Sequence, residues 1–333
     1  MRSSRFAALS LALFLGSLPA SPAFAEGVTV PVKSRAITEF KIGSAEKTFG
    51  PLEFLGGIEM TSSDSLLGSL SSIRFRPNGR DFVAIMDTGH WAEGSIERDA
   101  SGHLSGLADL TVTSMRDRNG ESENIKYRMD AEGLALHGET ALVSYERYHR
   151  VDVFADPGFA LSKPSGSLDI LIPIKELRGN GGLETVAVSP LNSTLAGATV
   201  VVAERSVDEE GNLFAAILDG PGKGIFKVVR RTPFDVTDGA FLPNGDLLLL
   251  ERRFNFGTGI GMQIRRIAGS SIKAGAVVDG EILLDADFGY QIDNMEGLDV
   301  VAGPGGEVRI VLVSDDNHSI LQRNLMLEFR LLK

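Results

Sequence analysis

Acidic side chains recur at two places in a repeated pattern of short apolar strands, at the start of one strand and at the end of the next. In "VLVSDDNHS", residues 311–319, an apolar run ends in two aspartates, an asparagine and a histidine. Carboxylate and amide oxygens gathered in one place suit a hard cation, general acid–base chemistry or both. The acids at strand starts are Glu132, Glu184, Asp238 and Glu296, and those at strand ends are Asp87, Glu146, Glu204, Glu251, Asp315 and Asp316.

The acids at strand starts follow a regular period. Ser71 aligns with them, and the successive positions lie 61, 52, 54 and 58 residues apart. Each repeat consists of a strand, a hairpin turn and a second strand. Two of the turns are Pro-Asn-Gly, at 77–79 and 243–245, and Asn and Gly accept the positive φ that tight hairpins need. A four-stranded unit of about this length is typical of a propeller blade, so the sequence predicts an all-β fold, a β-propeller.

The number of blades follows from the length. Residues 26–333 have room for six repeats, so we predict six blades, with five as the alternative. Only 37 residues follow Glu296, too few for a complete last blade. We therefore expect that blade to take a strand from the region before Ser71, so that pairing of N- and C-terminal strands closes the ring. No linker divides 26–333, which we expect to be a single propeller domain.

The first 25 residues have the pattern of a secretory signal peptide. Arg2 and Arg5 precede an apolar run at 6–18, and Ala-Phe-Ala at 23–25 is a cleavage motif. We expect cleavage after Ala25 and a periplasmic or secreted protein. The chain contains no cysteine, which excludes disulfides and thiol chemistry.

The negative charge of the chain limits the classes of molecule that it is expected to bind. The formal net charge is −11, and loss of the two leader arginines makes it more negative. Such a protein is not expected to bind nucleic acid non-specifically, and no segment after the leader is long and apolar enough to insert in a membrane. We expect a monomer that acts on a small molecule.

In a propeller, the acids of all repeats are expected to lie close together. Equivalent positions of all blades converge on the central axis, so the carboxylates meet at one mouth of the channel. Like charges at close range repel by several kcal/mol at a protein-like dielectric, so cations or protons must accompany them. Oxygen ligands suit Ca²⁺ best. The predicted metal ligands are Asp87, Glu132, Glu184, Glu204, Asp238, Glu251, Glu296, Asp315, Asp316 and Asn317.

A smaller set is predicted to act on the substrate. The candidate catalytic residues are Glu132, Glu296, Asp315, Arg205 and Arg252. Because neighbours on a strand point to opposite faces, the Glu-Arg pairs at 146–147, 204–205 and 251–252 fit interblade salt bridges equally well. His149 and His318 are the only histidines that follow acidic strand ends, which makes them candidates for acid–base work. Glycine follows Glu132, Asp238 and Glu296, which predicts close approach of a backbone or a ligand.

The chain resembles the phytase-like esterase family, whose members carry an "esterase-like activity of phytase" domain. The motifs of the resemblance, which covers about residues 52–332, are "LSSIRFRPNGRDFVAIMDTG", "DAEGLAL", "GGLETVAV" with "VVVAER", "LPNGDLLLLERRF" and "DNMEGLDVV" with "SDDNHSILQRNLMLEFRL". The resemblance implies a propeller rich in Asp and Glu that hydrolyses phosphoesters with clustered Ca²⁺. It carries a site role to Asp87, Glu132, Glu184, Glu204, Glu251, Glu296, Asp315 and Asp316.

Three functions stay open at this point. The first is a Ca²⁺-dependent phosphoesterase, in which a carboxylate is the general base and Arg205 or Arg252 binds the phosphate. The second is a Ca²⁺-dependent esterase or lactonase, which needs fewer basic residues. The third is a non-catalytic periplasmic binding or scaffold propeller whose acids hold a structural ion. Ser71 departs from the acid column, and no basic cluster accompanies the strand-end arginines except "VVRRTP".

Overall fold

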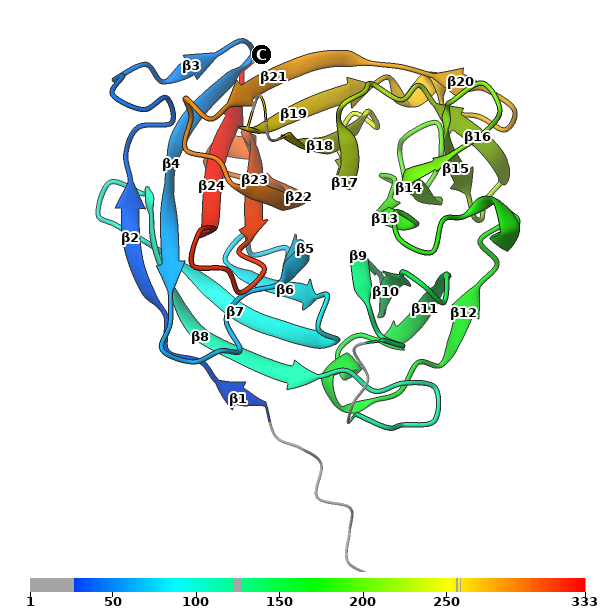
Figure 1. Cartoon of the computed structure of the whole chain (residues 1–333), viewed down its shortest axis with the longest axis horizontal. Coiled ribbons are helices and arrows are strands. Elements are labelled where there is room, and N and C mark those ends of the chain that lie inside the picture. Colours follow the sequence, from blue (N-terminus) through cyan, green and yellow to red (C-terminus); the bar gives the residue numbers. More distant parts are fainter. Residues whose placement is uncertain (1–26, 123–126, 256, 258, 333) are drawn as a thin grey trace, which may run out of the picture.

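Five twisted antiparallel sheets surround a central axis in the computed structural model of the chain (Figure 1). The structure describes residues 27–122, 127–255, 257 and 259–332. The predicted signal peptide lies outside these residues. The helices among them are single 3-10 turns at Phe159–Leu161, Ile174–Glu176, Gly269–Ser271 and Pro304–Gly306. None of these has the length or the apolar character to cross a bilayer.

Each sheet is one blade, and the innermost strands are those that begin at Leu70, Ala131, Leu183, Asp235 and Asn294. Blade 1 consists of β5 (Leu70–Phe75), β6 (Asp81–Met86), β7 (His90–Arg98) and β8 (Leu104–Ser114), with β1 (Val28–Thr29) on its outer edge. Blade 2 consists of β9 (Ala131–His137), β10 (Thr140–Tyr145), β11 (Arg150–Ala155) and β12 (Gly166–Leu168).

Blade 3 takes an edge strand from the segment that connects two strands of blade 4. Blade 3 consists of β13 (Leu183–Val188), β14 (Thr199–Val207), β15 (Leu213–Ile217) and β16 (Gly224–Val228), and β20 (Val277–Val278) joins β16 in parallel. Blade 4 consists of β17 (Asp235–Phe241), β18 (Leu247–Asn255), β19 (Gly259–Ile267) and β21 (Glu281–Asp287). The segment between β19 and β21 therefore crosses to the neighbouring blade and returns.

Blade 5 combines both ends of the described chain. It consists of β22 (Asn294–Ala302), β23 (Val308–Asp315), β24 (Asn324–Leu331), β4 (Leu52–Thr61) and β2 (Lys33–Ile37), and β3 (Thr48–Phe49) pairs with β4. β4 is antiparallel to β24, with Leu52 opposite Leu331 and Met60 opposite Asn324. A strand from the region before Ser71 thus completes the last blade.

The prediction of six blades is wrong, and the alternative of five is correct. Dividing the length by the period assumed that residues 26–70 contribute a blade of their own. Instead β2 and β4 are the outer strands of blade 5, and β1 extends blade 1. The described residues before β5 therefore add strands to two existing sheets and no sixth sheet.

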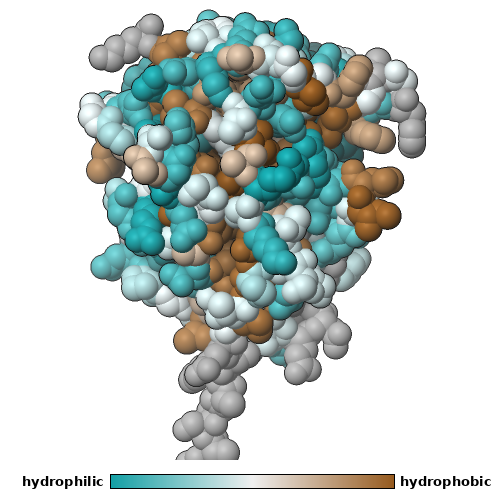
Figure 2. Space-filling model, turned by 90° about the vertical axis from the view of Figure 1, so that its left-hand side faces the viewer, coloured by the Kyte–Doolittle hydropathy of each residue, from teal (hydrophilic) through white to brown (hydrophobic). Residues whose placement is uncertain are grey.

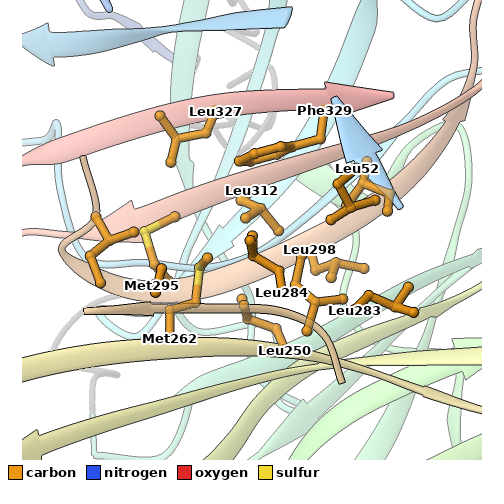
Figure 3. Packing of buried hydrophobic residues seen from close by; sticks show 14 of the residues in the cluster. Leu52, Leu250, Met262, Leu283, Leu284, Met295, Leu298, Leu312, Leu327 and Phe329 are labelled. Atoms are coloured by element: carbon orange, nitrogen blue, oxygen red, sulfur yellow. The ribbon is translucent and has the colours of Figure 1, made fainter. Parts of the chain in front are cut away.

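The blades are held together by apolar side chains between their facing sheets. Figure 3 shows this packing where Leu250 and Met262 of blade 4 face Leu298 and Leu312 of blade 5. All four are completely buried, and burial of such a side chain contributes about 1.5–3 kcal/mol. The outer side of the ring near β2 carries hydrophilic residues interspersed with hydrophobic ones (Figure 2), which is ordinary for a folded surface.

The two Pro-Asn-Gly hairpins are confirmed. Gly79 and Gly245 have φ of 64° and 90°, the conformation that favours glycine. Asn78 Oδ1 accepts hydrogen bonds from the backbone N–H groups of Arg80 and Asp81, each at 2.9 Å. The turn chemistry read from the sequence therefore sets the register of β5 against β6.

Candidate functional site

A β-bulge interrupts the inner strand pairing of every blade, and these bulges position the first acids of the site. In blade 1 the register shifts between Leu70 and Ser72, and in blade 2 it shifts opposite Ala131–Leu134. In blades 3, 4 and 5 it shifts between Leu183 and Thr185, between Val236 and Asp238, and between Met295 and Gly297. A bulge leaves one residue outside the ladder and re-aims its side chain. The bulged residues form a first ring, which consists of Ser71, Glu132, Glu184, Thr237 and Glu296.

The acids at strand ends occupy a second ring of equivalent positions, at the last pair of the ladder or just past it. Backbone bonds from Asp87 N to Ser69 O, Glu146 N to Asp130 O and Glu204 N to Gly182 O mark these positions in blades 1–3. In blades 4 and 5, Arg252 pairs with Asp235 and Asp315 pairs with Asn294. The second ring therefore consists of Asp87, Glu146, Glu204, Arg252 and Asp315.

All residues of the two rings except Thr237 line one cavity of about 240 Å³ at a mouth of the channel. Loop and strand-end residues from blade 2 and the segment before blade 3 complete its wall. The lining residues are Ser71, Asp87, Asp130, Glu132, Glu146, Arg147, Asn180, Glu184, Glu204, Arg205, Arg252, Glu296, Asp315 and Asn317. Eight of these carry carboxylates and three carry guanidinium groups, so the cavity is strongly acidic.

Two groups of carboxylates are close enough to share a metal ion. Oxygen atoms of Asp130, Glu132 and Glu146 lie within 4.8 Å of one another, and so do oxygen atoms of Glu146, Glu184 and Glu204. Glu146 belongs to both groups. The geometry therefore offers two adjacent positions for cations, joined by one bridging carboxylate.

The innermost acids have little compensation from the protein itself. Among the described residues, no hydrogen bond or ion pair joins the carboxylates of Glu132 and Glu184 to another side chain. Burial, followed by repulsion from neighbouring carboxylates, raises the pKa of both groups well above the usual value. Glu146 is better compensated, because its Oε1 accepts hydrogen bonds from the backbone N–H groups of Gly181 and Gly182.

Three other acids of the cavity have pKa values raised towards neutrality. Burial raises the pKa of Glu204 to about 7, and Arg205 and Arg252 moderate the shift. Burial likewise raises the pKa of Glu296 to about 7 and that of Asp315 to about 6. A group with such a pKa can accept and release a proton at physiological pH.

The three guanidinium groups of the cavity are bound to acids. Arg252 Nε lies 3.0 Å from Glu296 Oε1, and Arg205 Nη2 lies 3.2 Å from Glu204 Oε1. Arg205 Nε also donates to Asp235, at 2.8 Å. Arg147 Nε donates to Asp130 at 2.7 Å, from a residue with φ of 58°. Arg252 is the one residue of the second ring that carries positive charge.

Two predicted metal ligands, Asp238 and Glu251, lie outside the cavity because the alignment of blade 4 was one residue out of register. A shift of one residue turns a side chain to the opposite face of its strand. Thr237 and Arg252 occupy the ring positions instead. Both oxygens of Asp238 accept hydrogen bonds from Arg74, at 2.9 Å, and Glu251 accepts one from buried Arg265 at 2.6 Å.

Three further predicted residues also lie outside it. Asp316 faces a neighbouring groove, where Asn324 Nδ2 donates to its Oδ2 at 2.7 Å. His318 is exposed beside it. The ring of His149 packs against Gly182, where an added Cβ would lie 2.4 Å from the imidazole, so it supports the wall of the cavity.

The sequence reasoning missed several residues of the cavity. Glu146 was predicted at a strand end but not as a metal ligand. Arg147 follows it in one of the predicted Glu-Arg pairs but was not among the candidate catalytic residues. Asp130 and Asn180 lie between strands, where no column of the repeat includes them. Asp130 directly precedes β9, so the acid pair in "DAEG" was the signal that could have identified it.

The donor set fits calcium. All candidate ligand atoms are carboxylate or amide oxygens, the hard ligands that Ca²⁺ takes in irregular six- to eight-fold geometry. Carboxylates that are shielded from water without a cationic partner are costly. Glu184 is buried and Glu132 is half-buried, and neither forms an ion pair among the described residues. A divalent cation at either shared position would remove that cost.

Comparisons with known proteins identify the family of the chain. The family model "Phytase-like: Esterase-like activity of phytase" matches residues 65–318. No curated protein matches the chain. Among solved structures, a "glucose dehydrogenase" is 12% identical with a TM-score of 0.41, over 83% of this chain and 98% of that one.

A chain in "Crystal Structure of Mitotic Checkpoint Complex" is 10% identical with a TM-score of 0.38, over 99% of each chain. With TM-scores this low, neither likeness carries an argument about activity. The family match spans blades 2, 3 and 4 completely, β5–β8 of blade 1, and β22 and β23 of blade 5. The chain is therefore a β-propeller that belongs to the phytase-like family.

Proposed function

We propose that the protein is a Ca²⁺-dependent hydrolase of phosphate mono- or diesters and that the acidic cavity is its active site. The observation that carries the proposal is the crowding of eight carboxylates and three guanidinium groups into about 240 Å³. With every group ionised the formal balance is minus five, which repels any phosphate ester. Divalent cations reverse that repulsion, and two shared positions exist for them.

The proposed metal ligands are the carboxylates of both groups, Asp130, Glu132, Glu146, Glu184 and Glu204, with amide oxygens from Asn180 and Asn317. Calcium, when bound, would neutralise these carboxylates and polarise a phosphoryl oxygen of the ester. The chain orients the ligands through backbone N–H groups, as at Glu146. Asp315 is oriented in the same way, because its Oδ1 accepts the N–H of Asn317 at 2.7 Å.

Glu296 is the proposed general base. Its Oε1 accepts from Asn294 Nδ2 at 2.8 Å and lies 3.0 Å from Arg252 Nε, which leaves Oε2 to take a proton from water. Its pKa of about 7 suits that role. Arg252 would stabilise the negative charge that develops on the phosphoryl group, and Arg205 would hold the opposite edge of the site.

The proposal includes export of the protein. Residues 1–25 would direct the chain across the inner membrane and be removed after Ala25, which leaves a periplasmic or secreted monomer. Free Ca²⁺ at these locations is higher than in the cytoplasm, which suits a site of moderate affinity. The expected partner is a small phosphate ester.

The test is hydrolysis of p-nitrophenyl phosphate, bis-p-nitrophenyl phosphate, phytate and p-nitrophenyl acetate, each with Ca²⁺ and with chelator. The variant Glu296→Gln/Asp315→Asn should lose activity at least 100-fold. The matched control is Glu209→Gln, which makes the same change at an exposed turn position and should remain active. Calcium-dependent cleavage of a phosphate ester that the double variant loses would support the proposal.

A second candidate is hydrolysis of a carboxylic ester or lactone, with one Ca²⁺ in the same cavity. The observation that favours it is that Arg147, Arg205 and Arg252 are all paired with acids, so none is reserved for phosphate. Cleavage of p-nitrophenyl acetate alone would select this function. No turnover, together with a melting temperature raised by Ca²⁺, would select a binding or scaffold propeller with a structural ion.

A further inference from the structure

A second pocket, of about 220 Å³, lies on blade 2 next to the acidic cavity. We call it the blade 2 pocket. It has one aromatic residue and three arginines in its wall. The lining residues are Asp117, Arg118, Asn119, Arg128, Tyr148 and Arg150.

Two short segments supply residues to both sites. In the turn after β10, Glu146 and Arg147 line the acidic cavity, and the next residue, Tyr148, lines the blade 2 pocket. Before β9, Arg128 lines the pocket and Asp130 lines the cavity. Consecutive Cα atoms lie about 3.8 Å apart and only one or two residues separate the two linings, so a molecule of modest size can occupy both sites at once.

The aromatic wall is exposed and yet fixed in place. Tyr148 is 54% exposed and meets Tyr127, 59% exposed, edge to face with ring centroids 5.6 Å apart. Arg147 lies 5.3 Å from the centre of the Tyr127 ring. Arg150 Nη1 donates to the carbonyl oxygen of Tyr148 at 2.9 Å. An exposed ring that is already held in one position can stack on a ligand at low entropic cost.

The arginines of the pocket have a structural role and also keep N–H groups that can donate to a ligand. Asp152, fully buried, accepts from Arg118 Nη2 at 2.8 Å and from Arg150 Nε at 2.7 Å. That contact explains why two of the arginines are there. Arg118 is nevertheless 57% exposed at its side chain, and a guanidinium has five N–H donors. The carboxylate of Asp117 in the same wall is already paired with Arg128 Nη1 at 3.1 Å and accepts two backbone N–H groups. With the amide of Asn119, the pocket therefore presents mainly donors, where the neighbouring cavity presents acceptors.

We propose that the blade 2 pocket binds the planar, acceptor-rich ring of the substrate's leaving group, such as a nucleobase or an aryl group. The ring would stack on Tyr148, and Arg118 and Asn119 would donate to its acceptor atoms, while the ester lies in the acidic cavity. This inference rests on the proposed function, because it assigns the substrate class of that site.

The experiment compares phosphate monoesters that differ in the ring. Adenosine 5′-monophosphate and p-nitrophenyl phosphate carry one, and ribose 5-phosphate and glycerol 3-phosphate do not. Tyr148→Ala should lower kcat/KM for the ring-bearing pair about tenfold, the usual effect of removing a stacking partner, and should leave the other pair unchanged. Tyr148→Phe, which keeps the ring, should restore activity. Phe288→Ala, another exposed aromatic, is the matched control.

Equal losses for all four esters in Tyr148→Ala would overturn the inference, since they would indicate general damage to the turn. Binding of adenosine to the Ca²⁺-loaded protein, followed by saturation-transfer NMR, separates this inference from the proposed function. If no phosphate is cleaved but adenosine binds and Tyr148→Ala abolishes binding, the pocket stands and the phosphoesterase fails. If adenosine does not bind the unmodified protein, the inference fails.

Discussion

Arg74 and Asp238 form a bidentate ion pair at the axis of the propeller, with Nη1 and Nη2 each 2.9 Å from a carboxylate oxygen. The same guanidinium donates to the carbonyl oxygens of Val186, Gly239 and Leu298. One side chain of blade 1 therefore contacts blades 3, 4 and 5. It also separates the acidic cavity from the opposite mouth of the channel, where Arg74 lines a pocket of about 210 Å³.

Replacement of Arg74 by methionine should destabilise the protein by about 3–5 kcal/mol, because it leaves the buried carboxylate of Asp238 without a partner. Urea unfolding followed by circular dichroism measures the change. Arg80→Met is the control, since Arg80 is exposed on the same hairpin and should stay within about 0.5 kcal/mol of the unmodified protein. An equally small change in the free energy of unfolding for Arg74→Met would show that the axial ion pair does not hold the blades together.

Calcium should stabilise the folded protein, and Glu184 should have opposite effects with and without it. At a Ca²⁺ concentration one hundred times Kd, binding adds about 2.7 kcal/mol. In chelator, Glu184→Gln should raise Tm, because it removes one of the mutually repelling buried carboxylates. Addition of Ca²⁺ should raise the Tm of this variant by less than it raises the Tm of the unmodified protein. Differential scanning calorimetry tests both effects, and a lower Tm in chelator would contradict the role of repulsion.

Stability in chelator should fall as pH rises from about 4.5 to about 7. The folded protein keeps protons on Glu204 and Glu296, each with a pKa of about 7, which the unfolded chain has already released. Acids with lowered pKa, such as Asp246, are ionised throughout this window. Tm measured at half-unit steps of pH gives the slope, and Glu296→Gln should flatten it. A Tm that rises across the window would refute this account.

Gly133 should be intolerant of a side chain. A Cβ there would lie 2.4 Å from the carbonyl oxygen of Glu184 and 2.7 Å from Ser144 Oγ, so Gly133→Ala must push blade 3 away. The expected cost is about 1–3 kcal/mol, together with weaker Ca²⁺ binding by calorimetric titration. Gly166→Ala is the control, because nothing lies within 4 Å of its Cβ position. Unchanged Ca²⁺ affinity in Gly133→Ala would mean that Glu132 and Glu184 do not bind the ion together.

The repeat and its hairpins were sufficient to predict the fold class, because Pro-Asn-Gly turns and alternating strands are local signals. The register of blade 4 was not predictable in this way. Asp238-Gly239 and Glu296-Gly297 look alike in sequence, yet only the second pair has its acid at the bulge. Bulges depend on pairing with the next strand, which a single strand does not encode. Asn180 was missed for a related reason, since it reaches the cavity from a turn outside the repeat.

The pairing of β4 with β24 has a consequence for biogenesis. β4 leaves the ribosome before the strands β5–β23, whereas its partner β24 follows all of them. Until then the long edge of β4 has no partner on that side, and an unpaired edge is a template for association with other chains. A nascent chain that lacks β24 therefore exposes this edge of β4 to other chains, and blade 5 can form only after β24 has been synthesised.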